Sequence, residues 1–188
     1  MIYKKISLSS TQIKEASDFS NSISTTHYSN RNQFDNEKRK QDQLIGKLGE
    51  FASFEYLKQY NISTPDCKIY SSNNKSWEAD LHSKENNFHI KSQSLEQSKR
   101  FGMSWIFQFD RGKDLEIFNN KSNKDFVVFV VVSNKMEQVN SYICACVSVP
   151  FLHENNLFEE PVSNKLKGIK KAVYYSSLLK FESNLWQK

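Results

Sequence analysis

The sequence predicts a single α/β domain in which helices cover both faces of a central mixed β-sheet and form a three-layer core. Residues 126–132 are apolar throughout, as expected of a strand that is covered on both faces, so helices should lie on each side of the sheet. Residues 35–60 carry apolar side chains at helical spacing, which predicts one long amphipathic helix. A chain of 188 residues suffices for one hydrophobic core of ordinary size.

The first 35 residues are predicted to lie outside the main domain, which then spans residues 36–188. Residues 11–19 are expected to form a short helix. Residues 20–33 are dominated by Ser, Thr, Asn and Gln and contain almost nothing to bury, so they are expected to form a polar arm.

Short β-type runs separated by Asn, Ser and Lys clusters predict the strands of the sheet. The predicted strands comprise residues 67–70, 77–82, 88–93, 104–109, 126–133 and 141–149. Two helices are expected after them, at residues 150–156 and 176–186, the first of which opens with a proline. Cys144 and Cys146 lie two positions apart in the last strand, which predicts that both thiols point to the same face of the sheet.

Charge and hydropathy restrict the function classes. The formal net charge of +5 is compatible with a phosphate-rich partner, but a solvated surface explains a charge of this size more often. The longest apolar run, residues 126–132, is far too short to cross a bilayer, and residues 1–10 lack the apolar segment of a signal peptide. The sequence therefore predicts a cytoplasmic protein without a membrane partner.

Two successive strands each carry ionisable or polar side chains on one face, because side chains alternate along a strand. The two sets are Glu78, Asp80 and His82 in residues 77–82, and His89, Lys91 and Gln93 in residues 88–93. A four-residue turn between antiparallel strands would place Asp80 opposite His89. The same register places Glu78 opposite Lys91.

Such a cluster suits the hydrolysis of a phosphodiester bond. Carboxylate oxygens hold hard divalent cations such as Mg²⁺, which polarise the phosphoryl oxygen and activate water. A lysine beside the scissile phosphate offsets the developing negative charge or helps to deprotonate the nucleophile. The sequence therefore predicts Mg²⁺ or Mn²⁺ bound near Asp80 and Lys91.

The order and spacing of these residues resemble the core of the PD-(D/E)XK nuclease superfamily, which includes many restriction endonucleases and Holliday-junction resolvases. After Asp80 and a spacer, residues 89–93 read His-Ile-Lys-Ser-Gln, and upstream residues 46–50 read Gly-Lys-Leu-Gly-Glu, like the first core helix of the family. The resemblance covers residues 44–93 and implies a restriction-endonuclease-like three-layer core.

The resemblance also implies roles for individual residues. Asp80 would be the central metal ligand, Lys91 the catalytic lysine and Glu50 the acidic residue that the helix brings to the metal site. Gln93 matches a glutamine found in several branches of the superfamily. His89 stands where the family has Glu or Asp, and imidazole suits Mn²⁺ or Zn²⁺ better than Mg²⁺.

Because of this histidine, another residue is expected to complete the metal site. Glu50 and Glu78 are the candidates, and Glu50 is favoured. A softer metal and a catalytically inactive site are the alternatives.

Cations and aromatic residues mix directly after the lysine-bearing strand, a combination that suits phosphate contact and base stacking. The candidate phosphate contacts are Lys99, Arg100, Arg111 and Lys113. Trp105 and Phe107 are either stacking platforms or core residues, and the core interpretation is slightly favoured.

The resulting hypothesis is a Mg²⁺- or Mn²⁺-dependent endonuclease of restriction, phage or mobile-element type that cuts double-stranded DNA. A homodimer is expected, because cleavage of both strands favours two sites related by a two-fold axis. One alternative is a catalytically inactive DNA-binding module on the same fold, and another is a structure-selective resolvase or an RNase. An ordinary surface hairpin with a solvated polar face is the commonest explanation of such alternation, but the Gly-Glu helix and the covered neighbouring strands favour the nuclease interpretation.

Overall fold

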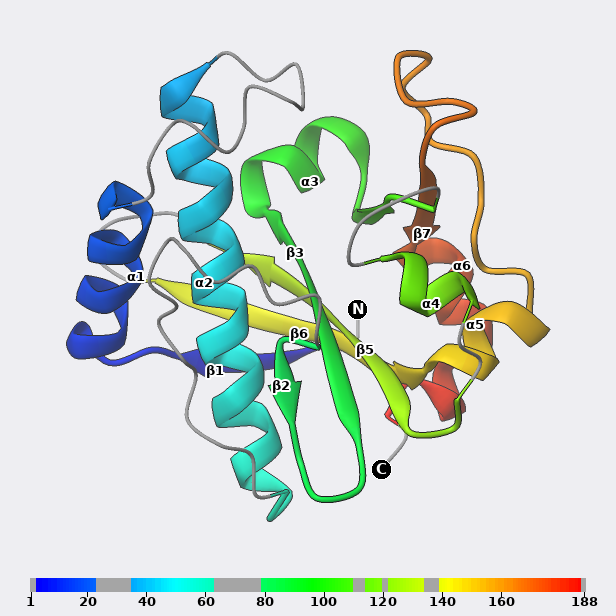
Figure 1. Cartoon of the computed structure of the whole chain (residues 1–188), viewed down its shortest axis with the longest axis horizontal. Helices are drawn as coiled ribbons and strands as arrows, with labels where there is room; N and C mark the ends of the chain where they lie inside the picture. Colours follow the sequence, from blue (N-terminus) through cyan, green and yellow to red (C-terminus); the bar gives the residue numbers. More distant parts are fainter. Residues whose placement is uncertain are drawn as a thin grey trace.

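The computed structural model describes residues 3–22, 35–62, 79–109, 114–119, 122–133 and 139–186, and these residues form two sheets and their covering helices (Figure 1). The strands are β1 (Lys4–Ser7), β2 (Leu81–His82), β3 (Asn87–Ser94), β4 (Ser104–Phe107), β5 (Asp125–Val132), β6 (Asn140–Ser148) and β7 (Lys171–Tyr174). The helices are α1 (Ser10–Ser22), α2 (Asn36–Gln59), α3 (Leu95–Phe101), α4 (Leu115–Asn119), α5 (Val149–Glu154) and α6 (Tyr175–Leu178), and a 3-10 helix (Leu179–Asn184) follows α6.

The larger described sheet is mixed, with the strand order β1-β6-β5-β3-β2. β3 and β5 run parallel, and the other neighbouring pairs are antiparallel. α1 and α2 lie on one side of this sheet, and α4, α5 and α6 lie on the other (Figure 1). The predicted α/β class with a mixed sheet between layers of helices is confirmed.

β5 is the central strand of both apolar cores. Its alternate residues Phe126, Val128, Val130 and Val132 join a cluster with α2, whereas Val127, Phe129 and Val131 join a cluster with β4, α5 and α6. All eight residues of β5 are buried. The strand therefore has no solvent-facing side, which explains why it lacks the polar alternation of a half-exposed strand.

Polar caps fix where the helices begin. The Asp35 carboxylate accepts a hydrogen bond from the Lys38 amide at 3.0 Å and starts α2. Ser94 ends β3 and caps α3, and Ser148 ends β6 and caps α5 in the same way. Each serine satisfies a helix amide that has no partner within its own helix. The caps therefore end the strands and set the positions of α3 and α5.

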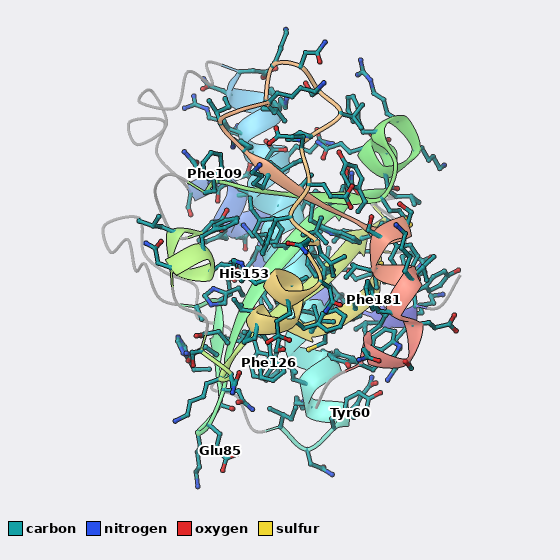
Figure 2. The ribbon with its side chains drawn as sticks, turned by 90° about the vertical axis from the view of Figure 1, so that its right-hand side faces the viewer. Tyr60, Glu85, Phe109, Phe126, His153 and Phe181 are labelled. Atoms are coloured by element: carbon teal, nitrogen blue, oxygen red, sulfur yellow. The ribbon has the colours of Figure 1, made fainter. Side chains whose placement is uncertain are left out.

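The predicted hairpin is present, in the predicted register. Leu81 pairs with Phe88 and His82 pairs with Asn87 in an antiparallel ladder between β2 and β3. Glu85 lies in the four-residue turn, is exposed, and projects from one end of the molecule (Figure 2). Extending this ladder by one position brings Asp80 opposite His89. Of the expected strand at residues 77–82, the structure describes residues 79–82, and the last two of these form β2.

The N-terminal segment belongs to the same core, in contrast to the predicted boundary at residue 35. β1 pairs with β6 and extends the larger sheet. α1 packs against α2, where the Gln12 amide donates to the Glu55 carboxylate at 2.9 Å and Ala16 is fully buried. The boundary was misplaced because β1 is short and only Ile6 in it is buried. The expected strand at residues 67–70 and most of the polar arm lie outside the described residues.

The two cysteines of β6 lie on opposite faces of the sheet, so the predicted common face is wrong. Phe129 pairs with Ala145 and Val130 pairs with Ile143, which leaves Cys144 as an extra residue in β6. Such a β-bulge shifts the alternation by one position. As a result Cys144 joins the core beside β4, whereas Cys146 joins the core beside α2.

β4 is not part of the larger sheet. It pairs with β7 in a two-stranded antiparallel sheet. The sequence predicted β4 but did not predict β7. It also missed the helices α3 and α4, whose 7 and 5 residues make fewer than two helical turns each. The expected helix at residues 176–186 corresponds to α6 and the 3-10 helix. Within the described part of the chain, no helix is long and apolar enough to cross a membrane.

Candidate active site

Asp80 lies directly before β2 and contacts the backbone of β3. The Ile90 N–H donates to the Asp80 Oδ2 atom at 2.7 Å. This bond holds the half-buried carboxylate against β3, one residue before Lys91. Asp80 therefore lies close to the strand that carries Lys91, as predicted.

Lys91 points to the face of β3 that packs against β4. Its Nζ atom lies 4.7 Å from the centre of the Phe107 ring and forms an ion pair with Asp114. The Lys91 and Asp114 side chains are only 18% and 12% exposed. The second oxygen of Asp114 accepts from the Gln108 N–H at 2.9 Å. The lysine is thus held in one place by an aromatic ring and an anchored carboxylate.

Glu50 lies on α2, which covers the opposite face of β3. Neighbouring Gly49 faces Ile90 and Ser92, whereas Lys91 faces the other core. The Glu50 carboxylate forms an ion pair with Lys47 one helical turn earlier. The glycine-bearing helix contacts the sheet closely at Gly49. The structure does not bring Glu50 to Lys91.

His89 belongs to a buried polar cluster at the start of β3 and β5. Its Nε2 atom lies 3.6 Å from the Asp125 Oδ1 atom, and both residues are less than a tenth exposed. The same oxygen accepts from the Asn87 side-chain amide at 2.8 Å, and Asn87 in turn contacts the His82 Nδ1 atom at 3.0 Å. His89 therefore has a carboxylate neighbour on the adjacent strand, and the sequence pattern gave no indication of that neighbour.

Gln93 uses both ends of its side-chain amide to hold the connection between β3 and β4. Its Nε2 atom donates to the Gly102 carbonyl at 3.1 Å, and its Oε1 atom accepts from the Ser104 N–H at 3.1 Å. The side chain is 7% exposed. Gln93 lies two residues beyond Lys91 on the same face and fixes the loop that follows α3.

The candidate phosphate contacts that are described lie on α3. Lys99 and Arg100 are exposed in its last turn, and the Arg100 guanidinium lies 5.0 Å from the centre of the Phe101 ring. Trp105 and Phe107 are 1% and 0% exposed, so the favoured core interpretation is confirmed and the alternative of stacking platforms is wrong. The remaining candidates Glu78, Arg111 and Lys113 lie outside the described residues.

Oxygen donors near Lys91 suit a hard cation by their chemistry. Asp80 and Asp114 contact consecutive residues of β3, the first through the Ile90 amide and the second through the Lys91 ammonium. Mg²⁺ commonly takes one or two protein carboxylates and keeps several water ligands. Within the described ranges, no three His, Cys, Asp or Glu side chains gather as a metal site.

Asp114 and Asp125 are the two acidic residues that the sequence did not connect to the site. Asp114 was visible only as part of a charged loop, and its contact with Lys91 spans 23 positions of sequence.

Comparison of the chain with protein-family models, with curated proteins and with solved structures found no match.

Proposed function

We propose that the chain is a metal-dependent endonuclease that hydrolyses phosphodiester bonds of double-stranded DNA. The observation that carries the proposal is the placement of Asp80 and Lys91. The Asp80 carboxylate is fixed beside Ile90, and the mostly buried Lys91 ammonium follows at the next position of the same strand. Metal-assisted phosphodiester hydrolysis uses a carboxylate that can hold the cation and a positive charge that stabilises the reacting phosphate.

In this proposal Asp80 holds Mg²⁺ or Mn²⁺, with Glu78 as a further acidic candidate. Glu50 is paired with Lys47 on the helix that covers the opposite face of β3 and takes no part. The cation, when bound, supplies a polarised phosphoryl oxygen and an activated water. Lys91 offsets the negative charge that develops on the phosphate, and Asp114 holds the lysine in its orientation. The ring of Phe107 excludes water from one side of the ammonium, which strengthens its interaction with phosphate.

The proposed partner is duplex DNA, bound by a homodimer in the cytoplasm. The exposed cations Lys99 and Arg100 on α3 would contact the backbone phosphates, together with Arg111 and Lys113. Two copies related by a two-fold axis would cut the two strands of a duplex.

A plasmid-nicking assay tests the proposal. Supercoiled DNA incubated with the protein and Mg²⁺ or Mn²⁺ should become nicked and then linear. Lys91→Ala should lower the cleavage rate by about a hundredfold or more, because it removes a preorganised charge at the reacting phosphate. Lys84→Ala, a change of an exposed lysine in the hairpin turn, is the matched control and should cut at the parent rate.

Intact plasmid with both metals would refute the proposal, as would a Lys91→Ala variant that cuts as fast as the parent. Thermal unfolding of each variant separates loss of activity from loss of folding.

Two observations favour a second candidate, a catalytically inactive DNA-binding module on the same fold. The Lys91 ammonium is already paired with Asp114, and His89 lies beside Asp125 where the resembling family has an acidic metal ligand. This candidate predicts DNA binding that weakens with salt, that Asp80→Ala leaves unchanged or improves, and that is never followed by cleavage. A panel of duplex, junction, single-stranded and RNA substrates would distinguish a resolvase or an RNase.

A further inference from the structure

A pocket of about 450 Å³ lies at the end of β3, between α3, β4, β7 and the segment that precedes β7. Gln93 and Ser104 line it from the sheet, Phe101 lines it from α3, and Val162 and Leu166 line it from the segment before β7. We call this hollow the Phe101 pocket. Its volume falls in the range of sites that take small organic groups.

Hydrogen bonds between wall residues hold the Phe101 pocket open. The Gln93 amide bonds to Gly102 and Ser104 on either side of the turn after α3. The Tyr174 hydroxyl accepts from the Val162 N–H at 2.9 Å and donates to the Glu160 carbonyl at 3.0 Å. Both walls are therefore tied to strands, and a ligand would find the pocket already formed.

The rim of the pocket exposes apolar side chains. Phe101 is 48% exposed and Val162 is 69% exposed. Among the described lining residues, the charged ones are Lys38 and Lys165, and both are cations. An aromatic face with two ammonium groups and no carboxylate suits a flat neutral ring that is flanked by negatively charged groups.

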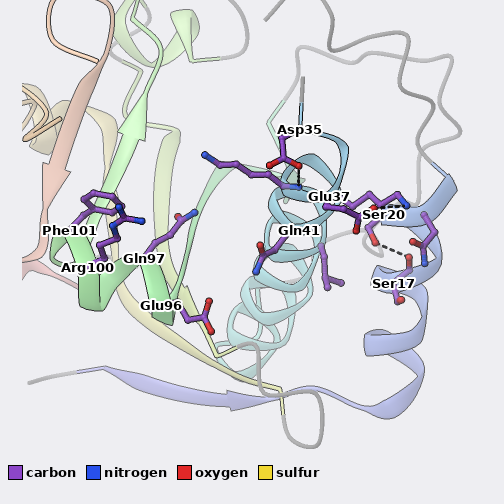
Figure 3. Close-up of a pocket in the computed structure, with 13 residues that line it drawn as sticks. Ser17, Ser20, Asp35, Glu37, Gln41, Glu96, Gln97, Arg100 and Phe101 are labelled. Atoms are coloured by element: carbon purple, nitrogen blue, oxygen red, sulfur yellow. Dashed lines mark hydrogen bonds and ion pairs between the residues drawn. The ribbon is translucent and has the colours of Figure 1, made fainter. Parts of the chain in front are cut away.

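A second hollow continues from the first across α3. It measures about 940 Å³ and shares Lys38, Gln97 and Phe101 with the Phe101 pocket. Figure 3 shows Gln97, Arg100 and Phe101 on the α3 side of this hollow and Gln41 on the α2 side. The shared residues make one path over α3. The charged lining of the second hollow is mixed and comprises Lys38, Lys40, Arg100, Asp35, Glu37 and Glu96.

We propose that the Phe101 pocket binds an unpaired base of a nucleic-acid strand, stacked on the Phe101 ring, with the flanking phosphates at Lys38 and Lys165. The inference rests on the proposed function, because it places this base beside the Lys91 site. Gln93 lies two residues from Lys91 on the same face of β3, which corresponds to about 7 Å along the strand. The substrate is then DNA with an unpaired nucleotide next to the bond that is cut.

Binding without cleavage provides the test. The full chain is titrated in EDTA with a short DNA duplex that contains one unpaired 2-aminopurine, and with the same duplex fully paired. We expect the bulged duplex to bind about tenfold more tightly, since stacking one base on an aromatic side chain contributes a factor of this order. The emission of 2-aminopurine should change on binding because the base enters a stack.

Three substitutions separate stacking from general effects on folding. Phe101→Leu keeps an apolar side chain but removes the ring, so the preference for the bulge and the change in emission should disappear. Phe101→Tyr keeps the ring and should retain both. Ile169→Ala removes a side chain that is 50% exposed outside the described lining of the pocket, and it should behave like the parent.

Equal affinity for the two duplexes, or unchanged 2-aminopurine emission with the parent protein, would overturn the inference. Competition by free dAMP as strong as that by the bulged duplex would assign the pocket to a free nucleotide and would overturn it too. The binding measurements need no metal and no cleavage. If the protein binds the bulged duplex more tightly but never cuts DNA, only the proposed nuclease activity is refuted. If the protein cuts DNA but binds both duplexes equally, only the proposed role of the Phe101 pocket is refuted.

Discussion

Gly49 of α2 lies so close to β3 that a Cβ atom at this position would come within 1.8 Å of the Ser92 Oγ atom and 2.9 Å of the Ser92 Cβ atom. The contact brings a helix backbone onto the strand that carries Lys91. Rotation of the serine side chain could move the Oγ atom away, but the Cβ atom is fixed by the backbone of β3. The glycine is therefore required by the approach of the helix to the sheet.

Gly49→Ala should destabilise the fold by about 1–3 kcal/mol, because the added methyl group forces α2 away from β3. Gly46→Ala is the matched control: nothing lies within 4 Å of an added Cβ atom there, and the change should stabilise the helix by up to about 1 kcal/mol. Urea unfolding measures both. Ser92→Gly should reduce the loss caused by Gly49→Ala, and an undiminished loss in that background would show that the clash lies elsewhere.

The ion pair between Lys91 and Asp114 should contribute measurably to stability, because both side chains are mostly buried. A double-mutant cycle with Lys91→Met and Asp114→Asn should give a coupling of about 1–2 kcal/mol, less than for a fully buried pair. The exposed pair of Glu37 and Lys40 is the control, with an expected coupling below about 0.5 kcal/mol. Equal couplings for the two pairs would contradict the assigned role of Asp114.

The same Asp114→Asn variant tests whether Asp114 positions the lysine for catalysis. Asparagine keeps an oxygen that can accept from Gln108, so the local backbone should persist. If the chain cuts DNA, turnover should fall by about tenfold while the affinity for DNA in EDTA stays at the parent value. A fall in affinity with unchanged turnover would instead place Asp114 in DNA binding.

The sequence predicted the elements that depend on local patterns. Helical spacing located α2, continuous apolar character located β5, and the alternation of polar residues gave the register between β2 and β3. These features succeed because each is set by the burial of one face of one segment, which neighbouring residues reveal.

Contacts between distant segments could not be predicted in this way. The Lys91–Asp114 pair and the approach of His89 to Asp125 join segments whose relative placement depends on the whole fold. The bulge at Cys144 inverted a prediction that was locally sound, because one inserted residue shifts every later side chain to the other face.

Burial should make the thiols of Cys144 and Cys146 inert until the protein unfolds. Burial raises the pKa of each thiol from the ordinary value of 9.0 to about 12. At about pH 8 this leaves about one thiol in ten thousand ionised, and only the thiolate reacts with thiol reagents. The third cysteine, Cys67, is first changed to serine so that only Cys144 and Cys146 can be labelled. The rate at which a thiol reagent labels this variant in native buffer should then follow the rate of unfolding. Rapid labelling of the folded protein would contradict the burial of these residues.

The same pKa shifts predict how stability depends on pH. The pKa of each thiol is higher in the folded protein than in the unfolded chain, so the contribution of the neutral thiols is complete below about pH 9. That contribution should be lost as the pH rises from about 9 towards 12, because the unfolded chain ionises first. Cys144→Ala together with Cys146→Ala should flatten this alkaline loss in urea titrations, relative to the parent.

Gln93 should tolerate a change to glutamate poorly at neutral pH, because its side chain must donate on one side and accept on the other. A carboxylate can still accept from the Ser104 N–H but opposes the Gly102 carbonyl, so Gln93→Glu should cost about 2 kcal/mol. Acidification should reduce the difference in stability between Gln93→Glu and the parent, since a protonated carboxyl group can donate to the Gly102 carbonyl again. Gln97→Glu on the exposed side of α3 makes the same chemical change and should leave stability within about 0.5 kcal/mol of the parent. Urea unfolding of the Gln93→Glu and Gln97→Glu variants at neutral and acidic pH distinguishes the two positions. Equal stability of the two variants at neutral pH would mean that the Gln93 amide does not hold the turn between β3 and β4.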